Sequence, residues 1–233
     1  TGAGLPVFMG LEGENAIGVY SANEYLTRSN LMKAYDKDYH TPIRKSKAVA
    51  VVGGGNVAMD ACRTAKRLGA EKVYIIYRRS EAEMPARLEE IHHAKEEQIE
   101  FLNLHNPVRI LVGENNEVTG MELQEMELGE PGADGRRKPI PVDRFKTIDV
   151  DTVIISIGTS PNPLIKSTTE HLDTNKKGCI SVDEDSMETT REGVFAGGDA
   201  VTGAATVILA MGAGKKAAAN MHKYICKKHG IEA

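Results

Sequence analysis

The chain has 233 residues, of which 41% are hydrophobic and 27% charged, a composition typical of a soluble globular protein with room for one large domain or two small ones. Its formal net charge of −4 and the lack of a basic and aromatic stripe argue against general nucleic-acid binding. No apolar run approaches the ~18–20 residues of a membrane helix, and no signal-peptide pattern stands at the start, so we expect no membrane segment. Three widely separated cysteines, Cys62, Cys179 and Cys226, indicate a reducing cytoplasm and not a disulfide scaffold.

The first part of the chain combines irregular and helical segments. Residues 1–18 are glycine-rich and are expected to be mostly irregular. A helix is predicted over 21–35, with Leu26, Leu31 and Met32 as candidate buried positions. The polar run 36–47 then indicates a linker. Because the chain opens without Met and without a strand before its first glycines, we expect a fragment or a processed form.

A strand, a glycine turn and a helix follow one another directly after this linker. The apolar run 48–52 predicts a buried strand, and a helix is predicted over 56–68. The residues at the turn and helix start match the pattern G-x-G-x-x-A: Gly53, Gly54, Gly55, Asn56, Val57 and Ala58. In this pattern Gly53 allows the tight turn, Gly55 admits a pyrophosphate to the backbone N–H groups, and Ala58 packs against the strand. The helix N-terminus adds unpaired N–H groups and a positive dipole, so the segment predicts a dinucleotide site.

The residues after the second strand indicate which dinucleotide binds. A strand is predicted over 72–77 and is followed by Arg78, Arg79 and Ser80, with no acidic residue among them. NAD sites place Asp or Glu here to accept from the ribose 2′-hydroxyl, whereas arginine accommodates a 2′-phosphate. The sequence therefore favours NADP(H). A plain glycine turn followed by a solvated basic pair is the alternative.

The remaining elements expected before residue 164 alternate between helix and strand. They are a helix over 85–98, strands over 100–104, 108–112 and 117–126, a hairpin turn at 113–116, a loop over 131–143, a buried parallel strand over 151–157, and a break in regular structure over 158–163.

The last third of the chain contains a second candidate binding site. Short strands are predicted over 178–182 and 193–196, the second delivering Gly197, Gly198 and Asp199 to its carboxyl end, and a small-residue helix is predicted over 205–227. An aspartate in this position is able to accept a hydrogen bond from a sugar or ribityl hydroxyl. The helix start, at Ala205 and Thr206, offers amides to a phosphate or ring carbonyl. A simple strand–turn–helix with Asp199 as N-cap is the alternative.

Several of these segments carry a family resemblance. The stretch 190–199 closely resembles the C-terminal FAD signature of two-dinucleotide flavoprotein oxidoreductases, in which the aspartate binds the ribityl chain. More specifically, the chain resembles the small (beta) subunit family of NADPH-dependent glutamate synthase and its relatives. The segments that carry this resemblance are 18–26, 53–60, 77–80, 83–86, 135–139 and 193–199.

The resemblance implies an α/β fold with a specific domain arrangement. A Rossmann-like three-layer NADPH-binding domain, 41–160, would be inserted in an incomplete FAD/NAD(P)-binding domain formed by segments 1–40 and 161–233. Such proteins open with an iron–sulfur domain and a first FAD-binding loop, and this sequence contains neither. The binding residues implied are Gly53–Ala58 and Arg78–Ser80 for NADPH, and Gly198, Asp199, Ala205 and Thr206 for FAD, with Gly158 as a further cofactor-binding residue.

The activity implied is hydride transfer from NADPH to FAD, with electrons passing on through iron–sulfur centres of the absent domain. The implied partner is the large subunit of glutamate synthase or a ferredoxin-type electron partner. We assign no catalytic acid, base or metal ligand, because the cofactors carry the redox chemistry. A disulfide reductase is disfavoured, since no two cysteines lie close together. A short-chain dehydrogenase is also disfavoured, because its Tyr224 and Lys228 pair would stand at the extreme C-terminus. A non-catalytic NADP(H)-binding module remains open.

Overall fold

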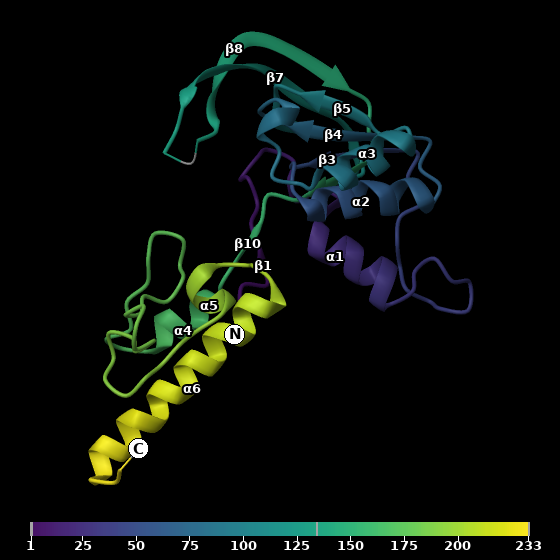
Figure 1. Ribbon diagram of the computed structural model, residues 1–233. Helices are drawn as coiled ribbons and strands as arrows, with labels where there is room; N and C mark the ends of the chain where they lie inside the picture. Colours follow the sequence, from purple (N-terminus) through teal and green to yellow (C-terminus); the bar gives the residue numbers. More distant parts are fainter. Residues whose placement is uncertain (1, 134, 233) are drawn as a thin grey trace. The chain divides into compact units, whose positions relative to one another are not determined.

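The computed structural model describes residues 2–133 and 135–232 and divides them into two compact units (Figure 1). The larger unit consists of residues 7–157, and the smaller unit combines residues 2–6 with 158–232.

A five-stranded parallel sheet forms the centre of the larger unit. Its strand order is β2-β9-β3-β4-β5. The strands are β2 (Val19–Ser21), β9 (Thr152–Ile155), β3 (Ala48–Val52), β4 (Lys72–Tyr77) and β5 (Glu100–Asn103). The predictions for β3 and β4 are confirmed to the residue, because both are continuous apolar runs of the kind that a doubly covered parallel sheet requires. The strand at β2 was not expected.

Both faces of this sheet are covered, which produces three layers. Along β3, Val49 and Val51 face one hydrophobic cluster, while Ala50 and Val52 face another. Such alternation follows from the two-residue period of a strand. The first cluster includes Ala58 and other residues of the helices, whereas the second includes residues of a separate antiparallel sheet. Figure 1 shows α1 and α2 on one side of the parallel sheet and β7 and β8 on the other.

The helical layer begins with α1 (Ala22–Leu26), which continues as a π-helical segment, η1 (Thr27–Leu31). The Ser21 side chain caps α1 by accepting from Glu24 N, as the sequence predicts for a helix start. The expectation that Leu31 and Met32 are buried is wrong, because they are 80% and 47% exposed. The wider turn of the π-helical segment changes which residues face the sheet.

The other helices of this layer are α2 (Asn56–Arg67), the short 3₁₀ segment η2 (Glu81–Glu83) and α3 (Leu88–Glu96). The prediction for α2 is confirmed, and Gly69, at φ +105°, follows its end in the conformation that favours glycine. Helix α3 begins three residues later than the predicted start at Pro85. The reason is that Ala86 N donates to Gly54 O, which holds the chain before Leu88 against the glycine turn.

The antiparallel sheet is formed by β6 (His105–Val112), β7 (Val118–Pro131) and β8 (Arg137–Ile148), in that order. The predicted hairpin turn at 113–116 is confirmed, with Gly113 N donating to Glu117 O at 2.9 Å. The expectation of a loop over 131–143 is wrong, because β8 occupies residues 137–143 of it. Its exposed, proline-containing sequence suits an edge strand, where missing N–H groups face solvent.

The regular secondary structure of the smaller unit is mainly helical. Its helices are α4 (Pro163–Thr168), α5 (Asp199–Thr202) and α6 (Val207–His229), beside a two-stranded ribbon of β1 (Leu5–Pro6) and β10 (Thr159–Ser160). The strands predicted over 178–182 and 193–196 are present only as isolated bridges, such as Val182 with Thr189 and Phe195 with Glu188. No helix among residues 2–133 and 135–232 combines the length and apolar character needed to cross a bilayer.

Candidate nucleotide-binding site

The predicted glycine turn lies at a topological switch point of the parallel sheet. Strand β3 pairs with β4 on one side and with β9 on the other, and the chain reaches these two neighbours in opposite directions. At the carboxyl end of β3, Gly53 N donates to Ile76 O at 3.0 Å, and Ser156 N donates to Val52 O at 2.8 Å. Open α/β sheets bind their ligands in the crevice outside such a point.

The three glycines of the turn are required for different reasons. Gly53 has φ +141°, and a Cβ there would lie 2.2 Å from Ser156 O on the neighbouring strand. A Cβ on Gly54 would lie 2.7 Å from the Tyr77 ring. For Gly55 the nearest atom to that position is Pro85 Cγ at 4.0 Å, so the protein itself does not need a glycine there. The open side of Gly55 therefore suits the close approach of a ligand.

Helix α2 presents an uncapped N-terminus beside this turn. Gly55 is the N-cap, and no side chain accepts from the first amides of the helix. The Asn56 side chain is directed elsewhere, because its Oδ1 accepts from Arg87 N at 2.9 Å. Val57 is exposed, whereas Ala58 is fully buried against the sheet. The helix dipole and the open amides favour an anion at this end.

The loop between β4 and α3 packs over the turn, a feature that the sequence reading missed. Ala86 N donates to Gly54 O at 3.1 Å, and Tyr77 OH donates to Glu83 O at 2.7 Å. Ser80 and Glu83 form a capping box at η2. The S-x-x-E spacing of this box was the available signal, because it marks a helix start in sequence.

The basic residues after β4 differ in their surroundings. The Arg78 side chain is exposed and makes no hydrogen bond or ion pair within the described part of the chain. Arg79 is half-buried, and its Nε donates to Arg137 O at 2.7 Å. Ser80 donates its hydroxyl proton to Glu83 Oε2 at 2.5 Å. Two guanidinium groups thus lie at the end of the strand that follows the glycine turn.

The second candidate site, around Gly198 and Asp199, lies within the smaller unit. A Cβ on Gly197 would lie 3.1 Å from the Ala213 backbone, so this turn packs closely on α6. The N-cap of α5 is Gly198, at φ +70°, and Asp199 is the first residue of that helix. The alternative of Asp199 as N-cap is therefore wrong. Asp199 Oδ1 instead accepts from Ala205 N at 3.3 Å.

The start of α6 also differs from its prediction. The helix begins at Val207, and Thr206 is its N-cap, with Oγ1 accepting from Leu209 N at 3.4 Å. Ala205 precedes the helix because its amide is bound by Asp199. Gly158 is exposed at φ +108° with no atom within 4 Å of a Cβ position, so only its backbone conformation favours glycine.

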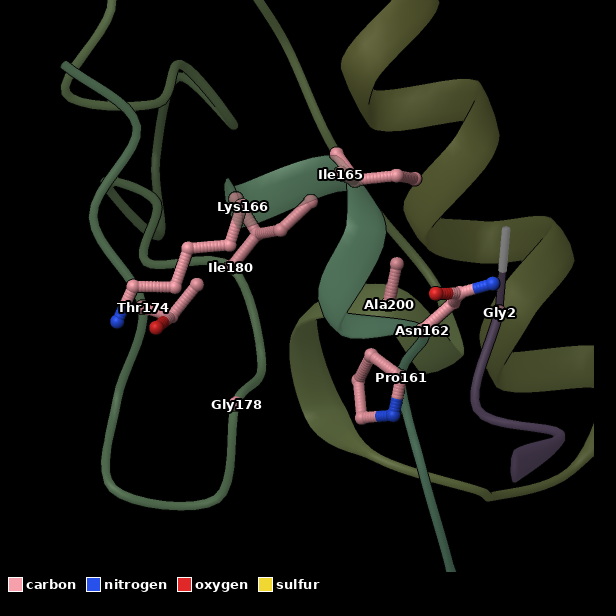
Figure 2. Close-up of a pocket in the computed structure, with 9 residues that line it drawn as sticks. All are labelled: Gly2, Pro161, Asn162, Ile165, Lys166, Thr174, Gly178, Ile180 and Ala200. Carbon is pink, nitrogen blue, oxygen red and sulfur yellow. The ribbon is translucent and has the colours of Figure 1, made fainter. Parts of the chain in front are cut away.

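The smaller unit contains a small cavity, which lies between α4, the segment 174–180 and the start of α5 (Figure 2). Its volume is about 10 Å³, which accommodates one water molecule. Thr174 lines it, and the Thr174 hydroxyl oxygen is buried without a hydrogen-bond partner. The cavity is suited to hydrate this hydroxyl and is too small for a cofactor. It is lined by Gly2, Pro161, Asn162, Ile165, Lys166, Thr174, Gly178, Ile180 and Ala200.

The cysteines form no redox pair among the described residues. Cys62, Cys179 and Cys226 are all free and buried. Burial raises the pKa of Cys62 to about 12, so its thiol stays protonated at neutral pH. Cys62 is therefore suited to packing and not to reaction as a thiolate.

Two curated relatives are similar to this chain over most of its length. The chain is 43% identical over 185 residues to the NADP(+)-dependent formate dehydrogenase subunit beta of Moorella thermoacetica, covering 79% of this chain and 26% of that protein. It is 36% identical over 216 residues to the glutamate synthase [NADPH] small chain of Escherichia coli, covering 90% of this chain and 46% of that one. The chain thus spans about a quarter to a half of these two relatives.

A solved structure shares the fold. Mycobacterium tuberculosis FprA, determined in complex with NADPH, superposes with a TM-score of 0.73 at 16% identity, covering 100% of this chain and 65% of that one. This likeness confirms the α/β fold of an FAD/NAD(P) oxidoreductase. The family model for pyridine nucleotide-disulphide oxidoreductases matches residues 1–215. The chain therefore belongs to the pyridine nucleotide-disulphide oxidoreductase family and is related to the small chains of NADPH-dependent glutamate synthase.

Proposed function

We propose that the chain is the NADPH-oxidising part of a flavoprotein similar to the small subunit of glutamate synthase. The single observation that carries this proposal is the glycine turn at the switch point, open at Gly55 and followed by Arg78, which is exposed and makes no hydrogen bond or ion pair among residues 2–133 and 135–232. Neither feature is explained by packing within the protein. Together they provide amides for a pyrophosphate and guanidinium groups for a further phosphate.

The residues of the larger unit would bind and orient the dinucleotide. The backbone from Gly53 to Ala58 would hold the pyrophosphate at the start of α2, where the dipole and the amides favour negative charge. Arg78, Arg79 and Ser80 would hold the 2′-phosphate of NADPH. These binding assignments rest on the motif and its geometry, and the bounds 41–160 of the NADPH-binding domain are proposed from the sequence resemblance.

The smaller unit carries the proposed contact with FAD. One oxygen of Asp199 accepts from Ala205 N, which fixes the carboxylate and leaves its second oxygen for a ribityl hydroxyl. Gly198, Ala205 and Thr206 would line the same end of α6. The smaller unit would thus belong to an FAD-binding domain of which other parts are needed to hold the flavin tightly, whereas residues 7–40, expected to join that domain, lie in the unit of the parallel sheet.

The chemistry is supplied by the cofactors when both are bound, as NADPH provides a hydride that flavin accepts and can release as single electrons. The protein contributes binding, orientation and exclusion of water. We further propose that the electrons pass to iron–sulfur centres elsewhere in a larger cytoplasmic protein. The acceptor would be a glutamate synthase large subunit or a ferredoxin-type partner.

The test uses the purified chain. An FAD-loaded preparation with a flavin absorbance band, which reduces a dye acceptor with NADPH, would support an oxidoreductase that works without further segments. A colourless protein that binds NADP⁺ by calorimetry would support the alternative of a non-catalytic NADP(H)-binding module. Failure to bind NADP⁺ in any form would contradict the proposed function.

A further inference from the structure

Strand β8 brings an additional arginine to the end of β4. Arg137 is the first residue of β8, and 57 residues separate it from Ser80 in sequence. Its Nη2 lies 3.4 Å from Ser80 Oγ, and its carbonyl oxygen accepts from Arg79 Nε at 2.7 Å. Two of the three residues proposed to hold the 2′-phosphate are therefore in direct contact with Arg137.

The same arginine engages the acidic residue of this region. Arg137 Nε donates to Glu83 Oε1 at 2.5 Å. The other oxygen, Oε2, accepts from Ser80 Oγ at 2.5 Å and from Ser80 N at 3.2 Å. The side chain of Glu83 is 8% exposed, whereas that of Arg137 is 45% exposed. Both carboxylate oxygens are thus occupied, and the guanidinium still faces solvent.

A charged Glu83 matters for cofactor choice. Hydrogen bonds from the Ser80 hydroxyl and the Arg137 guanidinium hold the pKa of Glu83 below its usual range, so the carboxylate is ionised at neutral pH. An ionised carboxylate at this end of β4 repels a 2′-phosphate and is suited to accept from the 2′-hydroxyl of NAD. Pairing with Arg137 neutralises the charge that would repel the 2′-phosphate. The same pairing occupies the carboxylate, so that it does not accept from the 2′-hydroxyl of NAD.

We propose that Arg137 determines selectivity for the 2′-phosphate, by neutralising Glu83 and by holding Arg79 and Ser80 in place. This inference rests on the proposed function and assigns to the β7–β8 hairpin a part in reading the cofactor. Arg137 is a specificity-determining and positioning residue, and the redox step does not require it.

The test compares two probes that differ only in the phosphate of interest, 2′,5′-ADP and 5′-AMP, by calorimetric titration of the full chain. The variant Arg137→Gln should weaken 2′,5′-ADP binding about 10- to 100-fold, because the unpaired Glu83 carboxylate would repel the phosphate and Arg79 and Ser80 would lose the group that holds them. Binding of 5′-AMP should change less than about twofold. The variant Arg137→Lys, which keeps the charge but not the planar fork, should show an intermediate loss.

Two further variants separate charge from folding. Arg144→Gln is the matched control, because Arg144 lies on the same strand and pairs with Glu125 at 2.6 Å, away from these residues. It should leave both affinities unchanged. The double variant Glu83→Gln with Arg137→Gln should recover part of the lost selectivity, since no carboxylate is then left unpaired. Such recovery is not expected if Arg137 only stabilises the hairpin.

The outcomes are distinguishable. Equal weakening of both probes, or no weakening of either, in Arg137→Gln would overturn the role of Arg137 while leaving the proposed function intact. If the unmodified chain binds 2′,5′-ADP no better than 5′-AMP, the proposed NADPH site itself fails, and the role of Arg137 fails with it. If Arg137→Gln does not fold, the intermediate loss in Arg137→Lys carries the same test.

Discussion

The two compact units differ in how completely they bury their apolar side chains. In the larger unit, Val49, Ala50 and Val51 of β3 are fully buried, because helices cover one face of the sheet and a second sheet covers the other. In the smaller unit, α6 exposes several large apolar residues in its first turns. These are Val207, Ile208, Leu209 and Met211, with exposed fractions of 76%, 81%, 64% and 57%.

This difference indicates that the two units depend on different contacts. The larger unit contains a core of its own on both faces of its sheet, so its stability should come from side chains within residues 7–157. An apolar patch of the kind found at the start of α6 usually marks a surface that contacts another segment or molecule. Substitutions of similar chemistry should therefore have unequal effects in the two units.

The largest difference is expected for glycines with positive φ. Gly53→Ala would place a Cβ 2.2 Å from Ser156 O, and we expect a loss of about 4 kcal/mol or failure to fold. Gly203→Ala, in the smaller unit, has the same kind of backbone strain at φ +83° but no atom within 4 Å, and should cost about 1–2 kcal/mol. Urea titration followed by circular dichroism measures both, and equal losses would contradict the packing described here.

Truncation of apolar side chains provides the next contrast. Met121→Ala should destabilise the larger unit by about 2–5 kcal/mol, because Met121 is fully buried between the two sheets. Ile208→Ala should change stability by less than about 0.5 kcal/mol, since Ile208 is 81% exposed. Tyrosine fluorescence reports the first effect, as six of the seven tyrosines lie within residues 7–157. A large loss in Ile208→Ala would show that α6 is covered.

Within the larger unit, the glycine turn should separate stability from binding. Gly55→Ala adds a methyl group where the protein leaves open space, so stability should change by about 1 kcal/mol or less. NADP⁺ affinity should fall at least about tenfold, because the methyl group blocks the approach of the pyrophosphate. Gly54→Ala, by contrast, meets the Tyr77 ring and should lower stability first. Calorimetry and urea titration on both variants check this ordering.

A pH-dependent effect is expected from the buried Cys62 thiol under alkaline conditions. Burial raises the pKa of Cys62 to about 12 from an ordinary value of 9.0, so the folded thiol keeps a proton that the unfolded chain releases. The resulting stability is fully present below pH 9 and is lost as the pH rises toward 12, at no more than about 1.4 kcal/mol per pH unit. Cys62→Ala should flatten the decline in unfolding free energy over that range. An unchanged slope would contradict this burial effect.

The parts of the fold that local sequence controls were predictable. Strands β3 and β4 are uninterrupted apolar runs, and α2 begins directly after the glycine turn, so their bounds follow from composition and turn chemistry. The first turn of α1 was equally predictable from its Ser21 cap. In each of these elements the local preference and the tertiary environment agree.

The parts that tertiary contacts control were not predictable. Strand β8 contains Pro139 and Pro141 and few buried residues, so its sequence predicts a loop. The strand forms because β7 pairs with it. The residues before α3 have helical preferences that the hydrogen bond from Ala86 to Gly54 overrides. Arg137 was not predicted as a site residue for the same reason, because only the pairing of β8 with β7 brings it near Ser80.

We propose that the arginines at the end of β4 bind a 2′-phosphate, and titration of NADP⁺ and NAD⁺ into the unmodified chain and into Arg78→Ala/Arg79→Ala tests this most directly. The unmodified chain should prefer NADP⁺ by at least about tenfold. The double variant should lose about 1.5–3 kcal/mol of NADP⁺ binding for each charge-assisted hydrogen bond removed, with NAD⁺ binding nearly unchanged. Equal loss for both nucleotides would contradict the claim, because these arginines would then not distinguish the phosphate.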